Sequence, residues 1–367
     1  MKIHVACGGT GGHIFPGLAT AEELLRHGHE VTLWMAGNDM ENLALKGWPG
    51  RTITVPAQGF QGGGVLRTLQ TARSLFRATR ICKRQMQPDP PDALLAMGSY
   101  ASVGPVRAAS QLGVPVILHE ANVIPGRAIR LCAPHATTVA AAFDETRYYL
   151  RSRRLEVTGM PLRRALVNAA LKPRARSPAD PFTVLIIGGS RGAQPLNRVV
   201  AAAAGEATRR RPGLRIIHLA GTRDEAATRR QYELAGVSAD VRGFCPDMGS
   251  LYPQADLAIC RAGASTCAEL ALYGLPALLV PYPHAARNHQ AANARALEKT
   301  GAADLVLEED LEAEWLAEYL VGMQDAAPRL ARMRQAAQLR ARGDAAAALA
   351  VQVERAAGGK SSHENLS

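Results

Sequence analysis

Residues 8–17 have the sequence GGTGGHIFPG, and residues 188–197 have the related sequence GGSRGAQPLN. Each glycine-rich stretch directly follows a short apolar run, Lys2–Ala6 in the first case and Thr183–Ile187 in the second. Each also leads into a segment with the apolar spacing of a helix. A strand, a glycine loop and a helix in this order begin a doubly wound α/β domain. The sequence therefore predicts two such Rossmann-like domains, each starting at one of the glycine loops.

The alternation of strand, loop and helix continues in both halves, which predicts parallel sheets with helices on both faces. Ligands of such sheets bind beyond the carboxyl ends of the strands, so two domains facing each other would form a cleft that carries both loops. A segment rich in Pro, Arg and Ser, Asn168–Pro181, separates the halves, and the last helical pattern covers Arg329–Ala357. The other expected strands are Val31–Ala36, Ala93–Met97, Val116–His119, Thr137–Ala140, Arg215–Ala220, Asp256–Cys260 and Ala277–Val280.

The chain carries 43 Lys and Arg against 32 Asp and Glu, a formal net charge of +11. This excess indicates an anionic partner, which could be a nucleic acid, a membrane surface or a phosphate-bearing substrate. Aromatic residues make up only 5% of the chain, and no basic and aromatic platform is evident, which argues against nucleic acid. No apolar run approaches the roughly 20 residues that span a bilayer, and the start lacks a signal-peptide pattern. We therefore expect a cytoplasmic protein.

Several common cofactor and metal patterns are missing from the sequence. Neither glycine loop has the third glycine of G-x-G-x-x-G or the G-K-S/T ending of a P-loop, which disfavours nicotinamide and ATP chemistry. The six cysteines form no C-x-x-C pair, so buried free thiols are expected rather than a zinc or redox site. No D-x-D pair that would hold a metal-bound diphosphate occurs. The sequence predicts neither a cofactor nor a metal.

The glycine loops and the segment after Asp256–Cys260 contain the candidate binding residues. A glycine loop before a helix exposes backbone N–H groups to a phosphate, although glycines can also simply form tight turns. In RAGAST, Ser265 can cap the following helix and place Glu269 one turn further along on the same side, where a carboxylate could accept two ribose hydroxyls. Glu269 could equally be a surface charge. The cluster Asn288–Gln290 suits sugar hydroxyls or helix capping.

Six motifs occur in order over residues 1 to about 355, and together they are specific: GGTGGHIFPGLA, HEANVIPG, TGMPLR, GGSRGA, CRAGASTCAE and NHQAANA. In combination they resemble the MurG family of glycosyltransferases. These enzymes transfer N-acetylglucosamine from UDP-GlcNAc to undecaprenyl-diphosphate-linked muramyl-pentapeptide, the last cytoplasmic step of peptidoglycan precursor synthesis. The resemblance implies the GT-B architecture, with an acceptor and membrane-docking domain at 1–160 and a UDP-GlcNAc-binding domain at 161–335. It also implies that a C-terminal helix at about 336–356 packs back on the first domain, before a disordered tail at 357–367.

The resemblance also implies the roles of individual residues. The backbone at Cys245 would contact uracil, Glu269 the ribose, and Ser190 with Arg163 the diphosphate. Ala264, Ser265 and Thr266 would line the nucleotide, and Gln290 would meet the GlcNAc hydroxyls, with His289 nearby. Thr10, Gly11, Gly12 and Asn122 would reach the donor sugar and the acceptor.

Forming a β-1,4 link from an α-linked donor requires inversion, and hence a base for the acceptor hydroxyl. His13 is the candidate, because the dipole of the helix that it begins would disfavour its protonated form. Its alternative roles are to orient the substrate or to cap the helix. The departing UDP would be stabilised by Arg163 and helix N–H groups without a metal. Ala121, Ser99 and Arg287 depart from residues common in the family and bear on acceptor contacts rather than on the reaction class.

The positive charge is concentrated between residues 42 and 88, where no Asp or Glu occurs. In Val65–Arg84, apolar and basic residues are interleaved in a way that suits a helix lying on an anionic membrane. An ordinary packed helix with a solvated basic face is the alternative. The expected docking residues are Leu69, Arg73, Leu75, Phe76, Arg77 and Arg80.

Three other functions are compatible with parts of the pattern. Another GT-B transferase acting on a different acceptor, or an epimerase of UDP-GlcNAc, would share the fold and the donor. A nucleic-acid-binding protein would share the basic charge. A UDP-sugar-binding module without catalysis would share the second half of the chain, although His13 and Asn122 argue against it.

Overall fold

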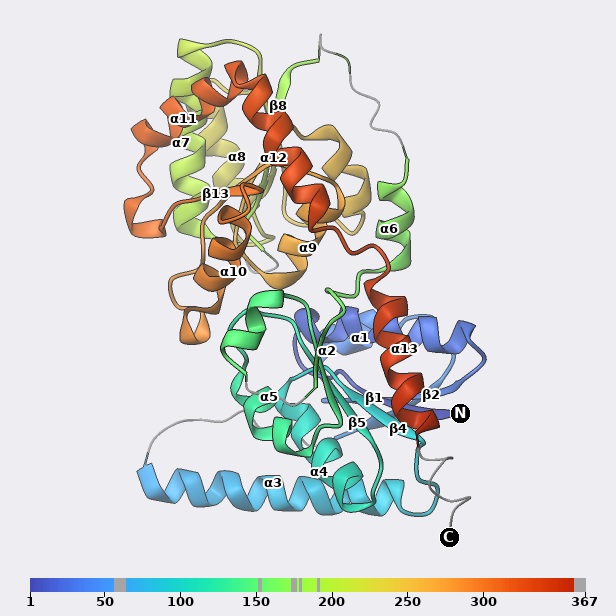
Figure 1. Cartoon of the computed structure of the whole chain (residues 1–367). Helices are drawn as coiled ribbons and strands as arrows, with labels where there is room; N and C mark the ends of the chain where they lie inside the picture. The colour runs from blue at the N-terminus through green and yellow to red at the C-terminus, as the bar shows by residue number, and fades with distance from the viewer. Residues whose placement is uncertain (56–63, 151–153, 173–176, 178–179, 190–191, 360–367) are drawn as a thin grey trace. The chain divides into compact units, whose positions relative to one another are not determined.

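The computed structural model describes residues 1–55, 64–150, 154–172, 177, 180–189 and 192–359 (Figure 1). The chain forms two compact units. The first contains Met1–Arg163 and the C-terminal stretch from Gly343, and the second contains Arg164–Arg342. In the described part of the chain, no helix combines the length and the apolar character needed to cross a membrane.

The first unit has a seven-stranded sheet in the order β3-β2-β1-β4-β5-β6-β7, with every pair parallel. The order reverses between β1 and β4, and ligands of doubly wound sheets bind at such a switch point. The expected strand at Lys2–Ala6 is confirmed. The strands are β1 Lys2–Ala6, β2 Glu30–Met35, β3 Arg51–Thr54, β4 Ala93–Ala96, β5 Val116–Glu120, β6 Thr138–Ala141 and β7 Leu155–Val157.

Helices cover both faces of this sheet because successive side chains of a strand point to opposite faces. In β1, Ile3 and Val5 belong to the core that includes α1 and α13, whereas Ala6 belongs to the core that includes α3, α4 and α5. The helices are α1 Gly11–Arg26, α2 Asp39–Ala44, α3 Gly64–Met86, α4 Val103–Gln111, α5 Arg127–Cys132 and α13 Ala345–Gly358, with 3-10 turns η1 Tyr100–Ser102, η2 Ala133–His135 and η3 Asp144–Tyr148.

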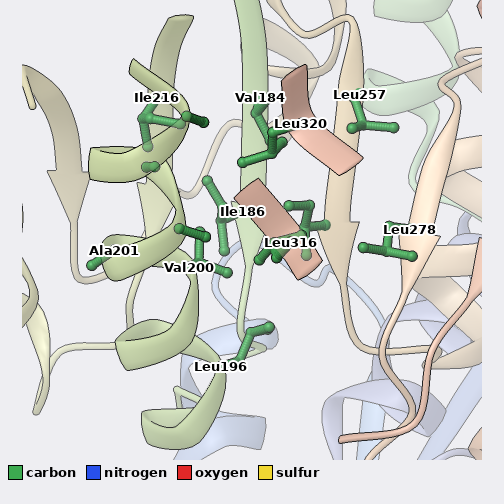
Figure 2. Close-up of a cluster of buried hydrophobic side chains, with 14 of the residues drawn as sticks. Val184, Ile186, Leu196, Val200, Ala201, Ile216, Leu257, Leu278, Leu316 and Leu320 are labelled. Carbon is green, nitrogen blue, oxygen red and sulfur yellow. The ribbon is translucent and has the colours of Figure 1, made fainter. Parts of the chain in front are cut away.

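The second unit repeats this plan with a six-stranded parallel sheet in the order β10-β9-β8-β11-β12-β13. Its switch point lies between β8 and β11. Figure 2 shows the buried cluster in which α7 and α11 cover one face of the sheet, with Leu196 and Val200 packed near Ile186. The strands are β8 Phe182–Ile187, β9 Leu214–Leu219, β10 Ala239–Arg242, β11 Leu257–Cys260, β12 Ala277–Leu279 and β13 Ala303–Leu305.

Helices and 3-10 turns connect these strands. The helices are α6 Arg164–Ala170, α7 Gln194–Arg210, α8 Glu225–Leu234, α9 Ala264–Leu272, α10 His289–Glu298, α11 Ala313–Asp325 and α12 Ala327–Leu339. The 3-10 turns are η4 Met248–Ser250, η5 Tyr252–Gln254, η6 Ala286–Asn288 and η7 Glu308–Asp310.

The prediction of one helix over Arg329–Ala357 is wrong. The segment forms α12 in the second unit and α13 in the first, with residues 340–344 between them. Gly343 disfavours a helix interior and Asp344 occupies the N-cap of α13, so the local sequence restarts the helix rather than continuing it. The helix on the first unit therefore begins at Ala345, later than the expected residue 336. It extends to Gly358, so the first residues of the expected tail are helical, and 360–367 lie outside the described residues.

Candidate active site

The glycines of the first loop are required by the close approach of the surrounding backbone. A Cβ on Gly8 would lie 2.4 Å from the backbone nitrogen of Ala36, and Gly9 has a φ of +131°. A Cβ on Gly17 would lie 2.3 Å from Cβ of Cys7, so this glycine lets α1 pack closely on the end of β1. The tight turn and close helix packing expected of such glycines are therefore present.

A buried carboxylate holds the first loop. Glu41 accepts hydrogen bonds from the backbone N–H groups of Gly9 at 2.7 Å, Ala36 at 3.1 Å, Gly37 at 2.5 Å and Asn38 at 3.2 Å. Asn38 also accepts from the N–H of Glu41, at 3.1 Å, which completes a reciprocal capping box at the start of α2. Glu41 is not among the residues predicted from the sequence. An N-cap residue followed three positions later by Glu is the signal that could have identified it.

The first turn of α1 carries the candidate base. This helix begins at Gly11, with Thr10 at its N-cap and Gly12 and His13 in its first turn. Nδ1 of the half-buried His13 lies 3.1 Å from the hydroxyl oxygen of Thr10. Burial lowers the pKa of His13 to about 4, so the imidazole is neutral at pH 7. The expected neutral state thus follows from desolvation rather than from the helix dipole alone.

Asn122 is positioned by a carboxylate at the end of β5. Glu120, buried, accepts hydrogen bonds from the N–H of Asn122 at 2.7 Å and from the N–H of Gly126 at 2.8 Å. Burial raises the pKa of Glu120, against the lowering effect of the hydrogen bonds that it accepts. The hydroxyl of Thr146 donates to the carbonyl of Asn122 at 3.1 Å. Three hydrogen bonds, two to Glu120 and one from Thr146, therefore fix the loop after β5.

A second buried imidazole, which the sequence analysis did not single out, precedes this carboxylate. Nε2 of His119 is 3.0 Å from the carbonyl oxygen of Gly159, so the ring donates from Nε2. Its Nδ1 is buried and has no hydrogen-bond partner. Burial lowers the pKa of His119 to about 4, and a charge on His13 would disfavour its protonation further. The first unit thus places two neutral imidazoles near its switch point.

In the second unit, the helix that follows β11 does not begin as predicted. Its N-cap is Gly263 rather than Ser265, and no side-chain hydrogen bond caps it. Ala264, Ser265 and Thr266 form its first turn, where backbone N–H groups have no partner within the helix. The extended φ and ψ of Gly263, −66° and 143°, place the N-cap two residues earlier than the predicted Ser265.

Glu269 is half-buried and held by a tyrosine rather than exposed as a simple surface charge. The hydroxyl of Tyr252 donates to Oε2 of Glu269 at 2.5 Å. The buried Tyr252 ring packs against Tyr273 with the ring centroids 4.8 Å apart, and Tyr273 donates to the carbonyl of Leu166 at 2.8 Å. These contacts fix the direction of the Glu269 carboxylate. Tyr252 is a positioning residue that no local sequence pattern indicated.

The second glycine loop follows β8. Gly192 has a φ of +78°, and a Cβ on it would lie 2.6 Å from the carbonyl oxygen of Ala220. The N–H of Gly192 donates to the carbonyl of Gly189 at 3.0 Å. Ser190, expected at the diphosphate, lies outside the described residues.

The helix after the second loop is anchored by a buried polar network. The side-chain amide of Asn197 donates to the carbonyl of Ala220 at 3.0 Å, and its Oδ1 lies 3.0 Å from Nε2 of His218. Nδ1 of His218 is 2.8 Å from the Tyr232 hydroxyl. Burial lowers the pKa of His218 to about 3, so its imidazole is neutral at pH 7. The Asn197 amide also donates to Oδ2 of Asp224 at 3.4 Å.

Arg261, in the motif after β11, organises the adjacent loops. It is buried, donates to the carbonyls of Val280 at 3.2 Å and Pro281 at 3.3 Å, and forms an ion pair with Glu308. Its guanidinium carbon lies 5.7 Å from the centroid of the Tyr282 ring. The sequence analysis treated this arginine only as part of a motif.

Gln290 lies at the start of α10 next to a strained turn. Its Oε1 accepts from the N–H of Tyr282 at 2.9 Å. Arg287 and Asn288 adopt left-handed backbone conformations, with φ of 57° and 55°. Non-glycine residues rarely adopt this conformation, and such strain clusters at ligand-binding sites. The His289 ring contacts the preceding turn, with Nδ1 2.8 Å from the carbonyl oxygen of Ala286.

Two further predicted residues have local partners. Cys245 is buried and its thiol donates to the carbonyl of Asp247 at 3.2 Å, while the neighbouring Phe244 is exposed. Arg163 belongs to the first unit, although the predicted boundary placed it in the second. Its guanidinium carbon lies 5.3 Å from the ring centroid of Phe15 on α1.

The expected docking helix forms as α3. Arg73, Arg77 and Arg80 are exposed, and the Phe76 side chain is 69% exposed. Leu75 packs partly against the core of the unit, so it points inward more than predicted. Leu69 lies in α3 and its side chain is outside the described part.

The comparisons with known proteins agree over both units. The sequence matches the glycosyltransferase family 28 N-terminal domain over residues 3–141 and the glycosyltransferase family 28 C-terminal domain over residues 183–349. The chain belongs to glycosyltransferase family 28. Family membership thus confirms the predicted glycosyltransferase and its two Rossmann-like domains.

Curated relatives carry the name UDP-N-acetylglucosamine–N-acetylmuramyl-(pentapeptide) pyrophosphoryl-undecaprenol N-acetylglucosamine transferase. The protein of that name from Acidithiobacillus ferrooxidans is 40% identical over 362 residues, covering 98% of this chain and 98% of the relative. The one from Geobacter metallireducens is 37% identical over 350 residues, covering 94% and 96%. The crystal structure of MurG from Acinetobacter baumannii aligns with a TM-score of 0.80 at 29% identity, covering 96% of this chain and 99% of that chain. The predicted resemblance to the MurG family is therefore confirmed.

Proposed function

We propose that this family 28 enzyme transfers N-acetylglucosamine from UDP-GlcNAc to the C4 hydroxyl of MurNAc-(pentapeptide)-diphosphoundecaprenol, a step of peptidoglycan synthesis. The observation that carries the proposal is the 40% identity to a transferase of this name over 98% of both chains. Identity over the full length, rather than in one unit, supports the same donor and acceptor instead of another UDP-sugar transferase with a different acceptor.

The second unit supplies the donor site in this proposal. Glu269, held by Tyr252, would accept the ribose hydroxyls, and the backbone at Cys245 would contact uracil. Ala264, Ser265 and Thr266 line the nucleotide, where the first turn of α9 directs N–H groups toward negative charge. Gln290 would meet the GlcNAc hydroxyls, and Ser190 the diphosphate, to which Arg163 of the first unit would add a positive charge.

The first unit supplies the acceptor side and the base. Thr10, Gly11, Gly12 and Asn122 would contact the acceptor and the donor sugar. His13, neutral because burial lowers its pKa to about 4, can take the proton of the C4 hydroxyl as that oxygen attacks the anomeric carbon. The C4 oxygen bonds to the anomeric carbon while the bond to UDP breaks, which inverts the configuration. Arg163 offsets the charge that develops on UDP, in a reaction that we expect to need no metal.

UDP release from UDP-GlcNAc by the purified protein tests this function. The assay is run in EDTA, with and without a short-chain lipid-diphosphate-MurNAc-pentapeptide acceptor. We expect release that depends on the acceptor. UDP-GlcNAc binding without release would contradict the acceptor assignment, and release that requires added Mg²⁺ would contradict metal independence.

The proposed acceptor is anchored in a bilayer, so the enzyme has to bind peripherally to the cytoplasmic face of the cell membrane. We assign this binding to α3. The exposed Arg73, Arg77 and Arg80 and the 69% exposed Phe76 share this helix. Each such cation contributes about 1 kcal/mol near an anionic surface, and an exposed aromatic ring adds apolar burial in the interface.

Reversing the charge of these three arginines to glutamate tests the membrane proposal. Losing three attractive cations predicts vesicle binding weaker by about 100-fold or more in co-sedimentation with anionic vesicles. Activity on the short-chain acceptor in detergent should persist. The matched control reverses Arg230, Lys299 and Arg332, three exposed cations of the second unit, and should bind vesicles normally. Equal vesicle binding by both triple variants would overturn the proposal.

A further inference from the structure

Two histidines and a glutamate meet where the C-terminal helix α13 packs on α1 in the first unit (Figure 1), at the end of α1 opposite the first glycine loop. Nδ1 of His27 is 2.6 Å and Nε2 of His29 is 2.9 Å from the same oxygen, Oε1 of Glu354. The three donor atoms lie within 4.8 Å of one another. In the described part of the chain, this is the one group of three His, Cys, Asp or Glu side chains that could hold a metal ion.

The local sequence His27-Gly28-His29 brings the two imidazoles to one side. His27 is the C-cap of α1, and Gly28 has a φ of +81°, the left-handed conformation that ends a helix. The chain reverses at this glycine, so His29 returns beside His27 with the ring centroids 6.3 Å apart. Glu354 then approaches from α13, which is more than 300 residues further along the sequence.

We propose that His27, His29 and Glu354 form a binding site for a divalent transition metal of the zinc class, which ties the C-terminal helix to α1. Two imidazole nitrogens and one carboxylate oxygen are a ligand set that zinc accepts, with water in the fourth position. Zn–N distances of about 2.0–2.1 Å in a tetrahedron correspond to ligand atoms roughly 3.3 Å apart. The separations here, from 2.6 Å to under 4.8 Å, bracket that value, so side-chain rotations suffice.

The surroundings of the cluster support this inference. The other ring nitrogen of His27, Nε2, lies 3.4 Å from Oε1 of Glu23, one helical turn earlier on α1. Metal-ligating histidines characteristically donate their second N–H to a carboxylate, which orients the ring.

The site has a structural role in this proposal, because it joins the start of the first unit to the stretch that returns after the whole second unit. Three ligands from two helices and the turn at Gly28 would fix the helix pair. The metal takes no part in sugar transfer, so the inference stands or falls independently of the proposed reaction.

Titration of the untagged, metal-free full chain with Zn²⁺ at pH 7.5, in competition with a chromophoric chelator, tests the proposal. We expect one Zn²⁺ per chain and a rise in the unfolding temperature. His27→Gln, His29→Gln and Glu354→Gln should each weaken binding at least tenfold, and Glu23→Gln about tenfold. Glucosaminyl transfer in EDTA should match the unaltered chain in all four variants, which also shows that they fold. The matched control, His135→Gln, replaces a histidine outside the cluster.

Substitution by Co²⁺ gives a second readout, since its visible absorption reports the ligands. We expect bands of a nitrogen and oxygen site, lost in His29→Gln. Absence of stoichiometric Zn²⁺ binding would overturn the proposal, as would binding that survives in the His27→Gln/His29→Gln double variant. A near-ultraviolet thiolate band with Co²⁺ would assign the metal to cysteines and overturn it equally.

Discussion

The two glycine loops follow the first strand of equivalent sheets, yet they are held by different chemistry. In the first, the buried carboxylate of Glu41 accepts the N–H of Gly9 together with three further backbone N–H groups. In the second, the N–H of Gly192 donates to a backbone carbonyl, and the helix that follows is fixed by the neutral network of Asn197, His218 and Tyr232.

This difference bears on what each loop can bind. The Gly9 amide is already engaged by an internal anion, so a phosphate at the first loop has to be met by other groups, and a nearby negative charge opposes it. Beside the second loop, the half-buried Asp224 carboxylate accepts from the side-chain amide of Asn197 at 3.4 Å rather than from the Gly192 N–H, which donates to a backbone carbonyl. If ligands bind at these loops as proposed, the shared strand, loop and helix would determine their position, whereas the anchoring residues would influence which charges they can carry.

The largest expected effect concerns the residue that only the first loop carries. His13→Ala should lower kcat by about 10²–10⁴-fold, because it removes a general base, while UDP-GlcNAc affinity in the second unit stays nearly unchanged. Steady-state kinetics and donor titration measure the two quantities. A decrease in kcat of less than tenfold would show that His13 is not the general base and would favour its role in orienting the substrate.

The pH dependence separates these roles further. The neutral imidazole is the active form, and burial lowers its pKa to about 4, so kcat/KM should fall only as the pH decreases toward 4. A decrease in kcat/KM with a midpoint near pH 6.5, the pKa of an exposed histidine, would contradict the desolvation of His13.

Removing the anchor of the first loop should have the next largest effect. Glu41→Ala leaves four backbone donors without their carboxylate, which predicts a loss of about 3 kcal/mol in the free energy of unfolding of the first unit. Urea unfolding followed with a probe in each unit measures this loss. Glu22→Ala, at an exposed position of α1, is the control and should change stability little. If Glu41→Ala leaves the free energy of unfolding of the first unit unchanged, water has replaced the carboxylate as the hydrogen-bond acceptor.

The anchor of the second loop should give the smallest effect and depend on pH. Burial lowers the pKa of His218 to about 3, below its unfolded value near 6.5, so its contribution to stability is complete above pH 6.5 and is lost as the pH falls toward 3. His218→Gln should cost about 1–3 kcal/mol at pH 8 and flatten the decline below pH 6.5. Thermal unfolding of the unaltered chain and of His218→Gln at several pH values tests this prediction. An equal loss of stability in both proteins as the pH falls below 6.5 would contradict it.

Much of the architecture was predictable because it depends on local patterns. Short apolar runs, such as Lys2–Ala6, determine strands through backbone sterics and burial, and the inner strands of both sheets follow from them. The edge strands β3, β7, β10 and β13 were not predicted, because they are short and less apolar. The sequence also determined the family, because its motifs recur in a fixed order. The break at Gly343 and Asp344 was also local, but the Ala- and Arg-rich composition of Arg329–Ala357 obscured it.

Only the tertiary structure decided which groups surround each candidate residue. Glu41 reaches the first loop from α2, Tyr252 reaches Glu269 across 17 positions, and Glu354 meets His27 across 327. Such contacts depend on how elements distant in sequence pack, which no periodicity records. The neutral state of His13 has the same origin, because desolvation is set by the atoms packed around the ring rather than by its neighbours along the chain.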